Sequence, residues 1–332
     1  MNYLGHLSQS DPLFGYLSAD ILPQLGIKGT RSDFRVFKIW ASNQVYLYED
    51  RFSQARIIAK FFGGTSDRSA EAAHGRMERE FNNLNHLRSL GFAHYPHYIA
   101  RPLGCNGSLN FLLTEEYCHG TPLTDFIMKA IREDGRDNLF KKLTALAYFL
   151  ATLHNETATG DRVDFSQDCV YFDRVVGQLE NRQHIACNEA KELYRLKDRW
   201  RKKEFMWEDN QVLVHGDVTP PNVLFGDDLW VIGIDLERMK LDDRVFDVGR
   251  VAAEIKHFFM QYAGNKWLAE PFIGHFLWEY SCRFPNRGAA FASITRRVPF
   301  HMGISLLRIA RNSWINNSYR RQLIDEAKNT LR

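Results

Sequence analysis

The chain has 332 residues, of which 45% are hydrophobic and 25% are charged, and its formal net charge is +3. This length accommodates a large core or two lobes, and the composition is that of a soluble globular protein. The small net charge argues against a nucleic-acid partner and against a membrane partner.

The first third of the sequence contains several predicted strands and one predicted helix. Apolar stretches with short polar connections predict strands over 34–40, 45–50, 56–62, 98–103 and 110–115. A helix is predicted over about 70–90, because Met77, Phe81, Leu84 and Leu87 recur at steps of three and four residues. Gly91 follows as a stop signal. Together these elements predict a small sheet with one helix, ending near residue 117.

The remainder of the sequence is predominantly helical. The predicted helices cover 138–154, 171–185, 188–205, 244–262, 266–282 and 298–315. One segment of short strands and loops, 212–239, interrupts them. We therefore predict an α+β protein with two domains. Residues 1–117 form a β-rich N-terminal lobe and residues 118–332 a larger helical C-terminal lobe, with a cleft at the hinge.

The interrupting segment, VLVHGDVTPPNVLFGDDLWVIGIDLERM, places polar side chains directly after apolar strands. Asp217, Asn222 and Asp235 each follow a short stretch that is typical of a buried strand. An aspartate on such a loop can accept a proton from a hydroxyl nucleophile, while the other two offer the hard oxygen ligands that suit Mg²⁺. Phosphoryl transfer needs this combination. The alternative is structural, with the aspartates capping turns and the asparagine serving as a turn residue.

These residues resemble a known family. The pattern HGDxxxxN at 215–222, followed by Ile-Asp-Leu-Glu at 234–237, is similar to the aminoglycoside phosphotransferase and choline kinase family. The helix that ends in Leu153-His154 and the segment 243–249 resemble that family too, as does the strand 58–62. The resemblance covers about 34–257. It implies a two-lobed protein-kinase-like fold and an ATP-dependent transfer of phosphate to a small molecule.

The resemblance also implies roles for individual residues. Asp217 orients or deprotonates the acceptor hydroxyl, and Asn222 and Asp235 hold Mg²⁺. Lys60 pairs with the nucleotide phosphates. Glu80 positions Lys60, matching the family's place for this acid better than Glu78 does. The sequence supports that choice independently, since Glu80 is spaced to lie near the apolar face of its helix, although a surface glutamate is the alternative.

The nucleotide site departs from the protein-kinase pattern, because no Gly-rich GxGxxG precedes Lys60. Ser42 and Asn43 stand in the loop where the family often contacts the phosphates, so we assign them to the cofactor site. We expect the nucleotide base to bond main-chain groups near Glu115 and Tyr117. The sequence leaves ATP and GTP both open.

Within the C-terminal lobe, two residues of the resembling segments are read as structural. We interpret Asp247 as a carboxylate at the start of the helix 244–262, where it accepts free N–H groups and braces the catalytic loop. His215 is expected to pack that loop without taking part in the chemistry.

The sequence says less about the acceptor than about the nucleotide site. Residues 280–324 contain no acid and eight arginines, and this charge favours a neutral or anionic hydroxyl compound such as a sugar or a phosphorylated metabolite. An aromatic cage for a quaternary ammonium is the alternative, which would make the acceptor cationic; its candidate members are Trp267, Phe272, Phe276, Trp278 and Tyr280.

Other classes of function have weaker support. The absence of HRD and DFG triplets counts against a protein kinase. A catalytically inactive nucleotide-binding scaffold would have lost the base or the metal ligands, which are all present. A nucleic-acid binder has the least support: the basic run 195–203 offers contacts to phosphate, but helices of this kind are commonly solvated faces.

Location is inferred from three absences. Residues 1–22 contain no basic stretch followed by an apolar one, so we expect no signal peptide. The longest apolar segment, 143–153, is well short of the roughly 20 residues that span a bilayer. The five cysteines form no CxxC pair, which favours reduced thiols. We therefore expect a cytoplasmic protein without a membrane partner, and its oligomeric state is open.

Overall fold

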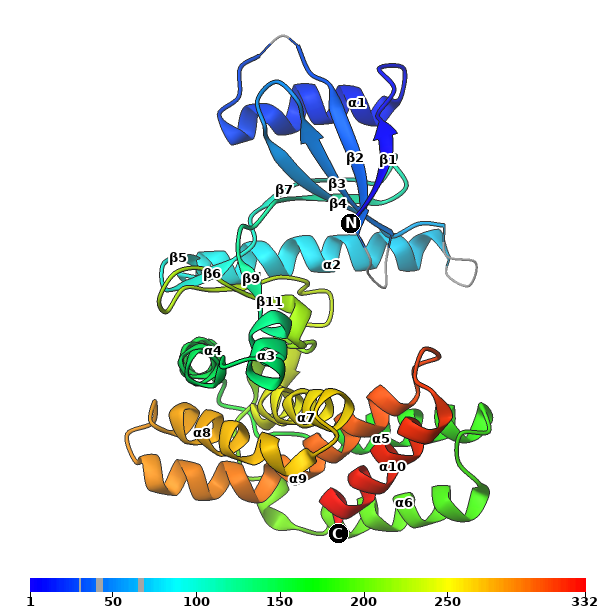
Figure 1. Cartoon of the computed structure of the whole chain (residues 1–332), viewed down its shortest axis with the longest axis vertical. Coiled ribbons are helices and arrows are strands. Elements are labelled where there is room, and N and C mark those ends of the chain that lie inside the picture. The colour runs from blue at the N-terminus through cyan, green and yellow to red at the C-terminus, as the bar shows by residue number, and fades with distance from the viewer. Residues whose placement is uncertain (30, 40–43, 65–68) are drawn as a thin grey trace. The chain divides into compact units, whose positions relative to one another are not determined.

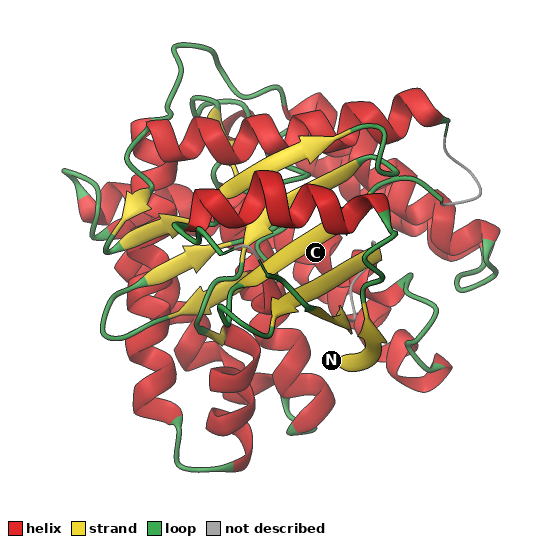
Figure 2. Cartoon of the chain, turned by 90° about the horizontal axis from the view of Figure 1, so that it is seen from above, coloured by secondary structure: helices red, strands yellow, loops and turns green. Residues whose placement is uncertain are grey.

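The computed structural model describes residues 1–29, 31–39, 44–64 and 69–332. This part of the chain forms two compact units. The first consists of Met1–Gly120 and Ile232–Glu237, and the second of Thr121–Val231 and Arg238–Arg332. Strands dominate the first unit and helices the second (Figure 1). This confirms the predicted α+β class. Figure 2 marks the helices, strands and loops by colour. A single division at residue 117 did not anticipate that Ile232–Glu237 returns to the first unit.

A six-stranded sheet forms the centre of the first unit. Its strands, in spatial order, are β1 (Asn2–His6), β2 (Phe34–Ile39), β3 (Gln44–Asp50), β4 (Arg56–Phe61), β8 (Leu112–Glu116) and β7 (Pro102–Asn106). All neighbouring pairs are antiparallel. Two short strands, β5 (Ala93–His94) and β6 (His97–Ile99), pair with each other elsewhere in the unit.

The N-terminal segment covers part of this sheet. The helix α1 (Pro12–Tyr16) continues through two short helical turns, η1 (Leu17–Ile21) and η2 (Leu22–Leu25). Its buried Leu17 and Ile21 join Phe34 and Ile57 of the sheet in one hydrophobic cluster. Neither β1 nor α1 was predicted from the sequence.

The helix α2 (Ala70–Ser89) agrees with the predicted helix 70–90. Ser69 begins it, and its hydroxyl accepts a hydrogen bond from the backbone N–H of Ala72 at 3.2 Å. The buried face of α2 repeats at three- and four-residue steps and contains Ala73, Met77, Glu80, Leu84 and Leu87. A carboxylate therefore occupies one position of an otherwise apolar stripe.

The segment Ile232–Glu237 follows the first residue of β12 (Val231–Gly233) and packs into the first unit. The backbone N–H of Ala100 donates to the carbonyl of Gly233 at 3.2 Å. The side-chain amide of Asn83, on α2, donates to the carbonyl of Leu236 at 2.8 Å. These bonds hold Asp235, which lies between the two carbonyls, inside the N-terminal unit.

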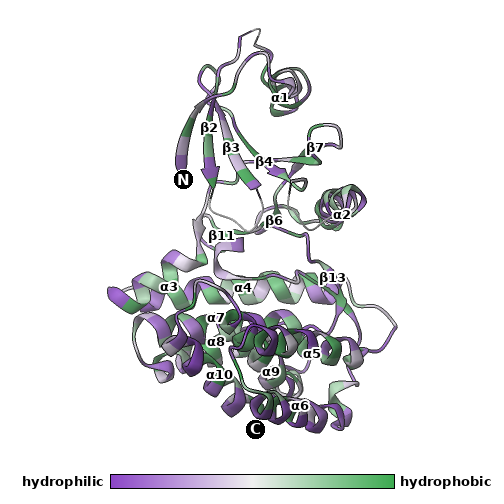
Figure 3. Ribbon diagram, turned by 90° about the vertical axis from the view of Figure 1, so that its right-hand side faces the viewer, coloured by the Kyte–Doolittle hydropathy of each residue, from purple (hydrophilic) through white to green (hydrophobic). Residues whose placement is uncertain are grey.

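The second unit contains eight α-helices within the part of the chain that the structure describes. They are α3 (Leu123–Arg132), α4 (Arg136–Glu156), α5 (Phe165–Asn181), α6 (Cys187–Arg201), α7 (Val245–Tyr262), α8 (Glu270–Ser281), α9 (Arg287–Ala310) and α10 (Asn317–Leu331). Hydrophobic and hydrophilic residues alternate around these helices (Figure 3), as expected when one face of each lies in the core. No described helix is both long enough and apolar enough to cross a membrane.

Short strands and turns link the helices of this unit. The strand β9 (Thr121–Pro122) pairs with β11 (Val223–Phe225), and β10 (Val212–Val214) pairs with β13 (Lys240–Asp242). Three short 3₁₀ turns are η3 (Glu204–Met206), η4 (Pro220–Asn222) and η5 (Lys266–Ala269).

Several predicted helix bounds were wrong. The predicted helix 266–282 is η5 followed by α8, and α9 begins at Arg287, 11 residues before the predicted start at 298. Proline favours the first turn of a helix, yet α9 continues through Pro299. The helices α3 and α10 were missed.

Candidate active site

Lys60 lies in the middle of the sheet of the first unit. Its neighbours across the sheet are Val45 on β3 and Leu113 on β8. The residue is 7% exposed, and its Nζ lies 2.5 Å from Oε1 of Glu80 and 2.8 Å from Oε1 of Glu115. Burial opposes the charge of Lys60, but Glu115 and Glu80 outweigh it and raise the pKa of Lys60. The ammonium group is therefore held charged between two buried carboxyl groups.

Glu80 rather than Glu78 is the partner of Lys60 on α2. Glu80 is fully buried, and burial raises its pKa to about 8 against the attraction of Lys60. Its second oxygen, Oε2, has no hydrogen-bond partner among the described residues. Glu78 points elsewhere, because its side chain is 54% exposed and lies 3.5 Å from His74.

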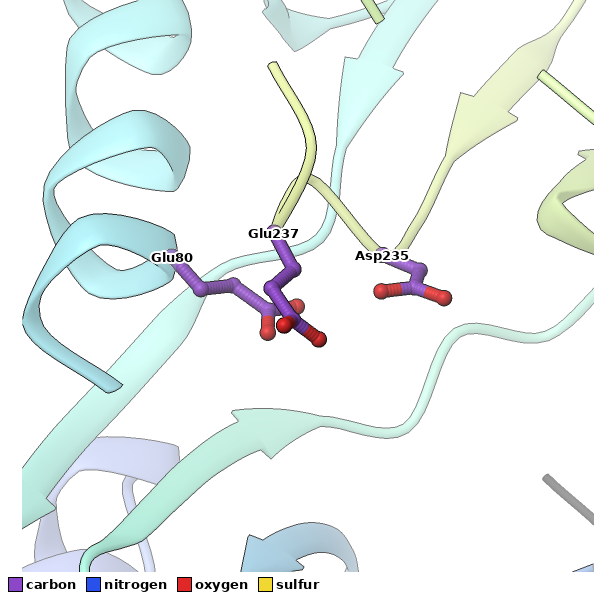
Figure 4. A group of neighbouring side chains, drawn as sticks. All are labelled: Glu80, Asp235 and Glu237. Carbon is purple, nitrogen blue, oxygen red and sulfur yellow. The ribbon is translucent and has the colours of Figure 1, made fainter. Parts of the chain in front are cut away.

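Three acids of the first unit converge beside Lys60. One carboxylate oxygen each of Glu80, Asp235 and Glu237 lies within 4.8 Å of the others (Figure 4). Asp235 has a φ of +65°, a left-handed conformation that aspartate tolerates better than most residues. Arg76 on α2 lies 3.6 Å from Glu237.

The charges around this acidic group suit a divalent cation. Four carboxyl groups, those of Glu80, Glu115, Asp235 and Glu237, face two cationic side chains, Lys60 and Arg76. The acids therefore outnumber the cations, and a bound divalent cation would favour the charged form of Glu80, whose pKa burial raises to about 8. Carboxylate oxygens are also the ligands that Mg²⁺ prefers, so the residues present fit the metal that the sequence implies.

In the second unit, Asp217 lies on the loop that follows β10, and Asp247 of α7 braces this loop. The carboxylate of Asp247 accepts hydrogen bonds from the backbone N–H groups of His215 at 2.6 Å and Gly216 at 3.0 Å. His154 Nε2 lies 3.2 Å from the same carboxylate. The predicted bracing is thus present. The predicted position is also confirmed, since Asp247 lies in the first turn of α7, although it is Asp243 that accepts from the backbone N–H of Val245.

Gly216 is required by the shape of this loop. Its φ is +79°, and a Cβ at this position would collide with the backbone carbonyl of Arg238. His215 is fully buried, and its Nδ1 lies 3.4 Å from the backbone nitrogen of Asp217. The ring of His215 and the close approach of Gly216 to Arg238 therefore fix the loop immediately before Asp217.

Three arginines approach the carboxylate of Asp217. Arg250 of α7 lies 2.9 Å from Oδ1 and also donates to the carbonyl of Gly216. Arg238 lies 3.6 Å from Oδ2 and Arg308 of α9 lies 3.9 Å from Oδ1. Burial acts to raise the pKa of Asp217, but Arg250, Arg308 and Arg238 outweigh it and lower that pKa. The carboxylate is therefore ionised at neutral pH.

Asn222 is placed by η4 in the same loop. Its side-chain amide donates to the carbonyl of Asp217 at 3.0 Å, which fixes the distance along the loop between these two residues. Asp235, the other metal ligand predicted from the sequence, belongs to the first unit together with Lys60, Glu80 and Glu115.

The remaining predicted nucleotide contacts lie in or beside β8. The side chain of Glu115 is directed to Lys60, although the sequence suggested only a main-chain role. The backbone N–H of Tyr117 donates to the carbonyl of Arg56 at 3.3 Å. The predicted phosphate contacts Ser42 and Asn43 lie outside the described residues.

Sequence reasoning did not identify Arg250, Arg308 or the side chain of Glu115 as parts of these groups. For Arg250 a signal existed, since it follows Asp247 by three residues and therefore shares its helix face. Arg308 is 91 residues away from Asp217, and no spacing rule connects them.

Several solved structures of other proteins are similar to this chain over nearly its whole length. Among solved structures, a choline kinase from Cryptosporidium parvum Iowa II superposes with a TM-score of 0.63 at 12% identity, covering 96% of this chain and 94% of that one. The ternary complex of APH(2″)-IIa with streptomycin and ATP has a TM-score of 0.57 at 12% identity, covering 97% and 96%. Macrolide 2′-phosphotransferase type I has a TM-score of 0.55 at 16% identity, and the superposition covers 99% of each chain.

These likenesses show the fold, which is that of the kinase-like phosphotransferases, as predicted. A search of curated protein sequences found no match. Residues 33–281 match the family described as the phosphotransferase enzyme family. Since this match covers most of the sequence and includes Lys60, Asp217 and Asp235, the chain belongs to the phosphotransferase enzyme family.

Proposed function

We propose that this protein is an ATP-dependent kinase that transfers the γ-phosphate to a hydroxyl group of a small molecule. The observation that carries this proposal is the buried Lys60 held between Glu80 and Glu115, beside the acids Asp235 and Glu237. A buried ammonium with this many acidic neighbours is costly as a purely structural device. It is well suited to nucleotide phosphates once a divalent cation offsets the acids.

In this proposal Lys60 contacts the nucleotide phosphates and Glu80 positions it. Asp235 and Asn222 hold Mg²⁺, and Glu237 is available beside Asp235. When bound, Mg²⁺ neutralises charge on the transferring phosphate. Ser42 and Asn43, with main-chain groups near Glu115 and Tyr117, are assigned to the nucleotide as the sequence implies.

Asp217 orients the acceptor hydroxyl. Its low pKa makes it a weak proton acceptor, so its main contribution is to hold the hydroxyl in line and to take the proton late. Arg250 and the carbonyl of Gly216 fix the loop that carries it.

The acceptor is proposed to be neutral or anionic. Of the five residues considered for an aromatic cage, Phe272, Phe276 and Tyr280 are fully buried in the core. Phe272 stacks on Phe140, with 4.5 Å between ring centroids. The cage for a cationic acceptor is therefore not formed by these residues. An inactive scaffold is the remaining alternative, and the intact Asp217 and Lys60 argue against it.

The direct test is a coupled assay of ATP turnover with the purified protein over small hydroxyl compounds. Stimulation by at least one compound, with stoichiometric phosphorylation of its hydroxyl, is the expected result. Binding of Mg-ATP without turnover on any hydroxyl compound would favour the scaffold.

Mg-ATP is expected to raise the melting temperature of the wild-type protein. A ligand at 100 times its Kd stabilises the native state by about 2.7 kcal/mol. Asp235→Ala and Asn222→Ala are expected to lose the part of this shift that depends on Mg²⁺, measured by differential scanning fluorimetry. ATP with a chelator is the control, and an unchanged wild-type curve at millimolar Mg-ATP would contradict the proposal.

The lowered pKa of Asp217 predicts the acid side of the pH–rate profile. A carboxylate with a lowered pKa stays functional as the pH falls, until the pH reaches its own pKa, below the ordinary value of 3.8. Arg238→Gln removes one of the cations that lower this pKa. As the pH is lowered, kcat/KM of this variant should therefore begin to fall at a higher pH than kcat/KM of the wild type. Arg287→Gln, at the other end of the C-terminal region, should leave the profile in place.

A further inference from the structure

Four arginines gather around Asp217 and Tyr171 from different parts of the second unit. Arg238 follows the Ile232–Glu237 segment, Arg250 lies on α7, and Arg308 and Arg311 lie at the C-terminal end of α9. The first three lie within 4.0 Å of the carboxylate of Asp217. We call these four residues the arginine cluster.

The cluster carries more positive charge than the acids that it contacts. Its ion pairs among the described residues are with Asp217 and with Glu254, which Arg308 contacts. Arg311 instead donates to the neutral side-chain amide of Gln178 at 2.6 Å. Four guanidinium groups thus face two carboxylates, which leaves a surplus of two positive charges.

Buried donors of the cluster are also unsatisfied. Within the described residues, Nε of Arg250 and Nε of Arg308 are buried without a hydrogen-bond partner, and so is the hydroxyl of Tyr171 on α5. Arg250 is 2% exposed. Buried donors without acceptors are costly, because they lose their bonds to water. An acceptor with several oxygens would satisfy them.

The effect of the cluster on Tyr171 supports this interpretation. Burial acts to raise the pKa of Tyr171, yet Arg250, Arg308 and Arg311 outweigh burial and lower that pKa. The potential around the hydroxyl is therefore strongly positive, and it favours negative charge at this place.

Three other arginines of the acid-free region 280–324 are engaged elsewhere. Arg297 binds Asp209 and Asp243, each at 2.5 Å. Arg320 donates to the carbonyls of Ala310, Asn312 and Ile315. Arg321 binds Glu189 at 2.6 Å. Arg308 and Arg311 are the two arginines of this region that belong to the cluster.

We propose that the arginine cluster and Tyr171 bind an anionic group of the acceptor, a phosphate or a carboxylate, whose hydroxyl is oriented by Asp217. The substrates are then acidic alcohols, such as sugar phosphates or hydroxy acids. Guanidinium groups suit this task, because they bind phosphate and carboxylate through two parallel hydrogen bonds. This inference rests on the proposed kinase activity.

Arg311 extends the cluster beyond the immediate surroundings of Asp217. No ion pair joins Arg311 to Asp217 among the described residues, and Arg311 instead extends toward Gln178 of α5. Tyr171 belongs to the same helix. The cluster therefore reaches from the carboxylate that orients the hydroxyl to a second position on α5, as expected for a substrate whose hydroxyl and anionic group lie apart.

The test uses pairs of acceptors that differ only in the anionic group. Glycerol is compared with glycerol 3-phosphate, and glucose with glucose 6-phosphate, with choline as the cationic probe. In a coupled assay the acidic member of a pair should have at least a 10-fold higher kcat/KM. Arg311→Gln should raise KM for that acceptor by about 10- to 100-fold, the cost of one charge-assisted contact. It should leave KM for Mg-ATP unchanged.

Tyr171→Phe, which removes one hydroxyl, should have a smaller effect in the same direction. Arg287→Gln is the matched control. It removes the same charge from the opposite end of α9, where Arg287 stacks on Trp278, and it should change nothing. If the protein phosphorylates neutral or cationic acceptors as efficiently as acidic ones, the anionic site is overturned, while the kinase activity stands. If Arg311→Gln lowers kcat equally with every acceptor, the cluster acts on the transferred phosphate, and the proposed anionic site is overturned as well.

A binding measurement keeps the proposal testable without turnover. Inorganic phosphate should raise the melting temperature of the wild type and of Arg287→Gln, and this shift should be lost in Arg311→Gln. An equal shift in all three proteins would overturn the proposal. Loss of the shift in Arg311→Gln together with no effect of Mg-ATP on any variant would support the anion site and contradict the kinase activity.

Discussion

Replacing Asp217 by asparagine is expected to lower kcat on the true acceptor by about 10²-fold or more, in line with the contribution of a general base. Asparagine keeps the size of the side chain and can still bond the hydroxyl, but it cannot accept the proton. It also removes the charge that Arg250 contacts at 2.9 Å. Single-turnover kinetics at saturating Mg-ATP measure this change directly.

Folding and nucleotide binding should survive this substitution. The loop is held by Asp247 through the backbone N–H groups of His215 and Gly216, and these bonds do not involve the side chain of Asp217. The melting curve and the Kd for Mg-ATP are therefore the controls. If Asp217 only shaped a turn, asparagine would serve equally well, and wild-type turnover in a folded variant would remove Asp217 from the mechanism.

Lys60→Met is expected to cost both activity and about 3–5 kcal/mol of the free energy of unfolding, the usual effect of removing one partner of a buried ion pair. Methionine fills the volume but leaves Glu80 and Glu115 buried without their cation. Urea unfolding measures the stability, and Mg-ATP titration measures the loss of nucleotide affinity.

The matched control is Lys38→Met on β2, where the same substitution affects an exposed lysine of the same sheet. It should change stability by no more than about 0.5 kcal/mol. Combining Lys60→Met with Glu80→Gln should recover part of the lost stability without recovering nucleotide binding. If the Lys60→Met protein is as stable as the Lys38→Met protein, the ion pairs of Lys60 with Glu80 and Glu115 do not stabilise the N-terminal unit.

Local patterns predicted much of this protein. The periodic apolar residues of α2 gave its bounds almost to the residue, and the alternation of apolar strands and polar loops over 212–239 located Asp217, Asn222 and Asp235. Glu80 could be chosen over Glu78 because a helix brings residues three and four positions apart onto one face. All of these signals act within a few residues along the chain.

Contacts between distant segments could not be predicted in this way. The arginine cluster joins Arg250 to Arg308, which belong to different helices, and only the packing of α7 against α9 brings them together. Glu115 was expected to act through its main chain, because a strand pattern does not say which charged partner lies on the neighbouring strand. The N-terminal β1 and α1 were missed since their segments are short and weakly periodic.

The return of Ile232–Glu237 to the first unit has a consequence for synthesis on the ribosome. Gly120 ends the first continuous part of that unit, and its last part is complete only at Glu237, 117 residues later. At roughly 5–20 residues per second, the nascent chain waits about 6–23 seconds for this segment. During that interval Asn83 and Ala100 lack the carbonyls that they bond in the finished protein, and Lys60 lacks Asp235. The N-terminal unit is therefore finished only after much of the helical unit has been made.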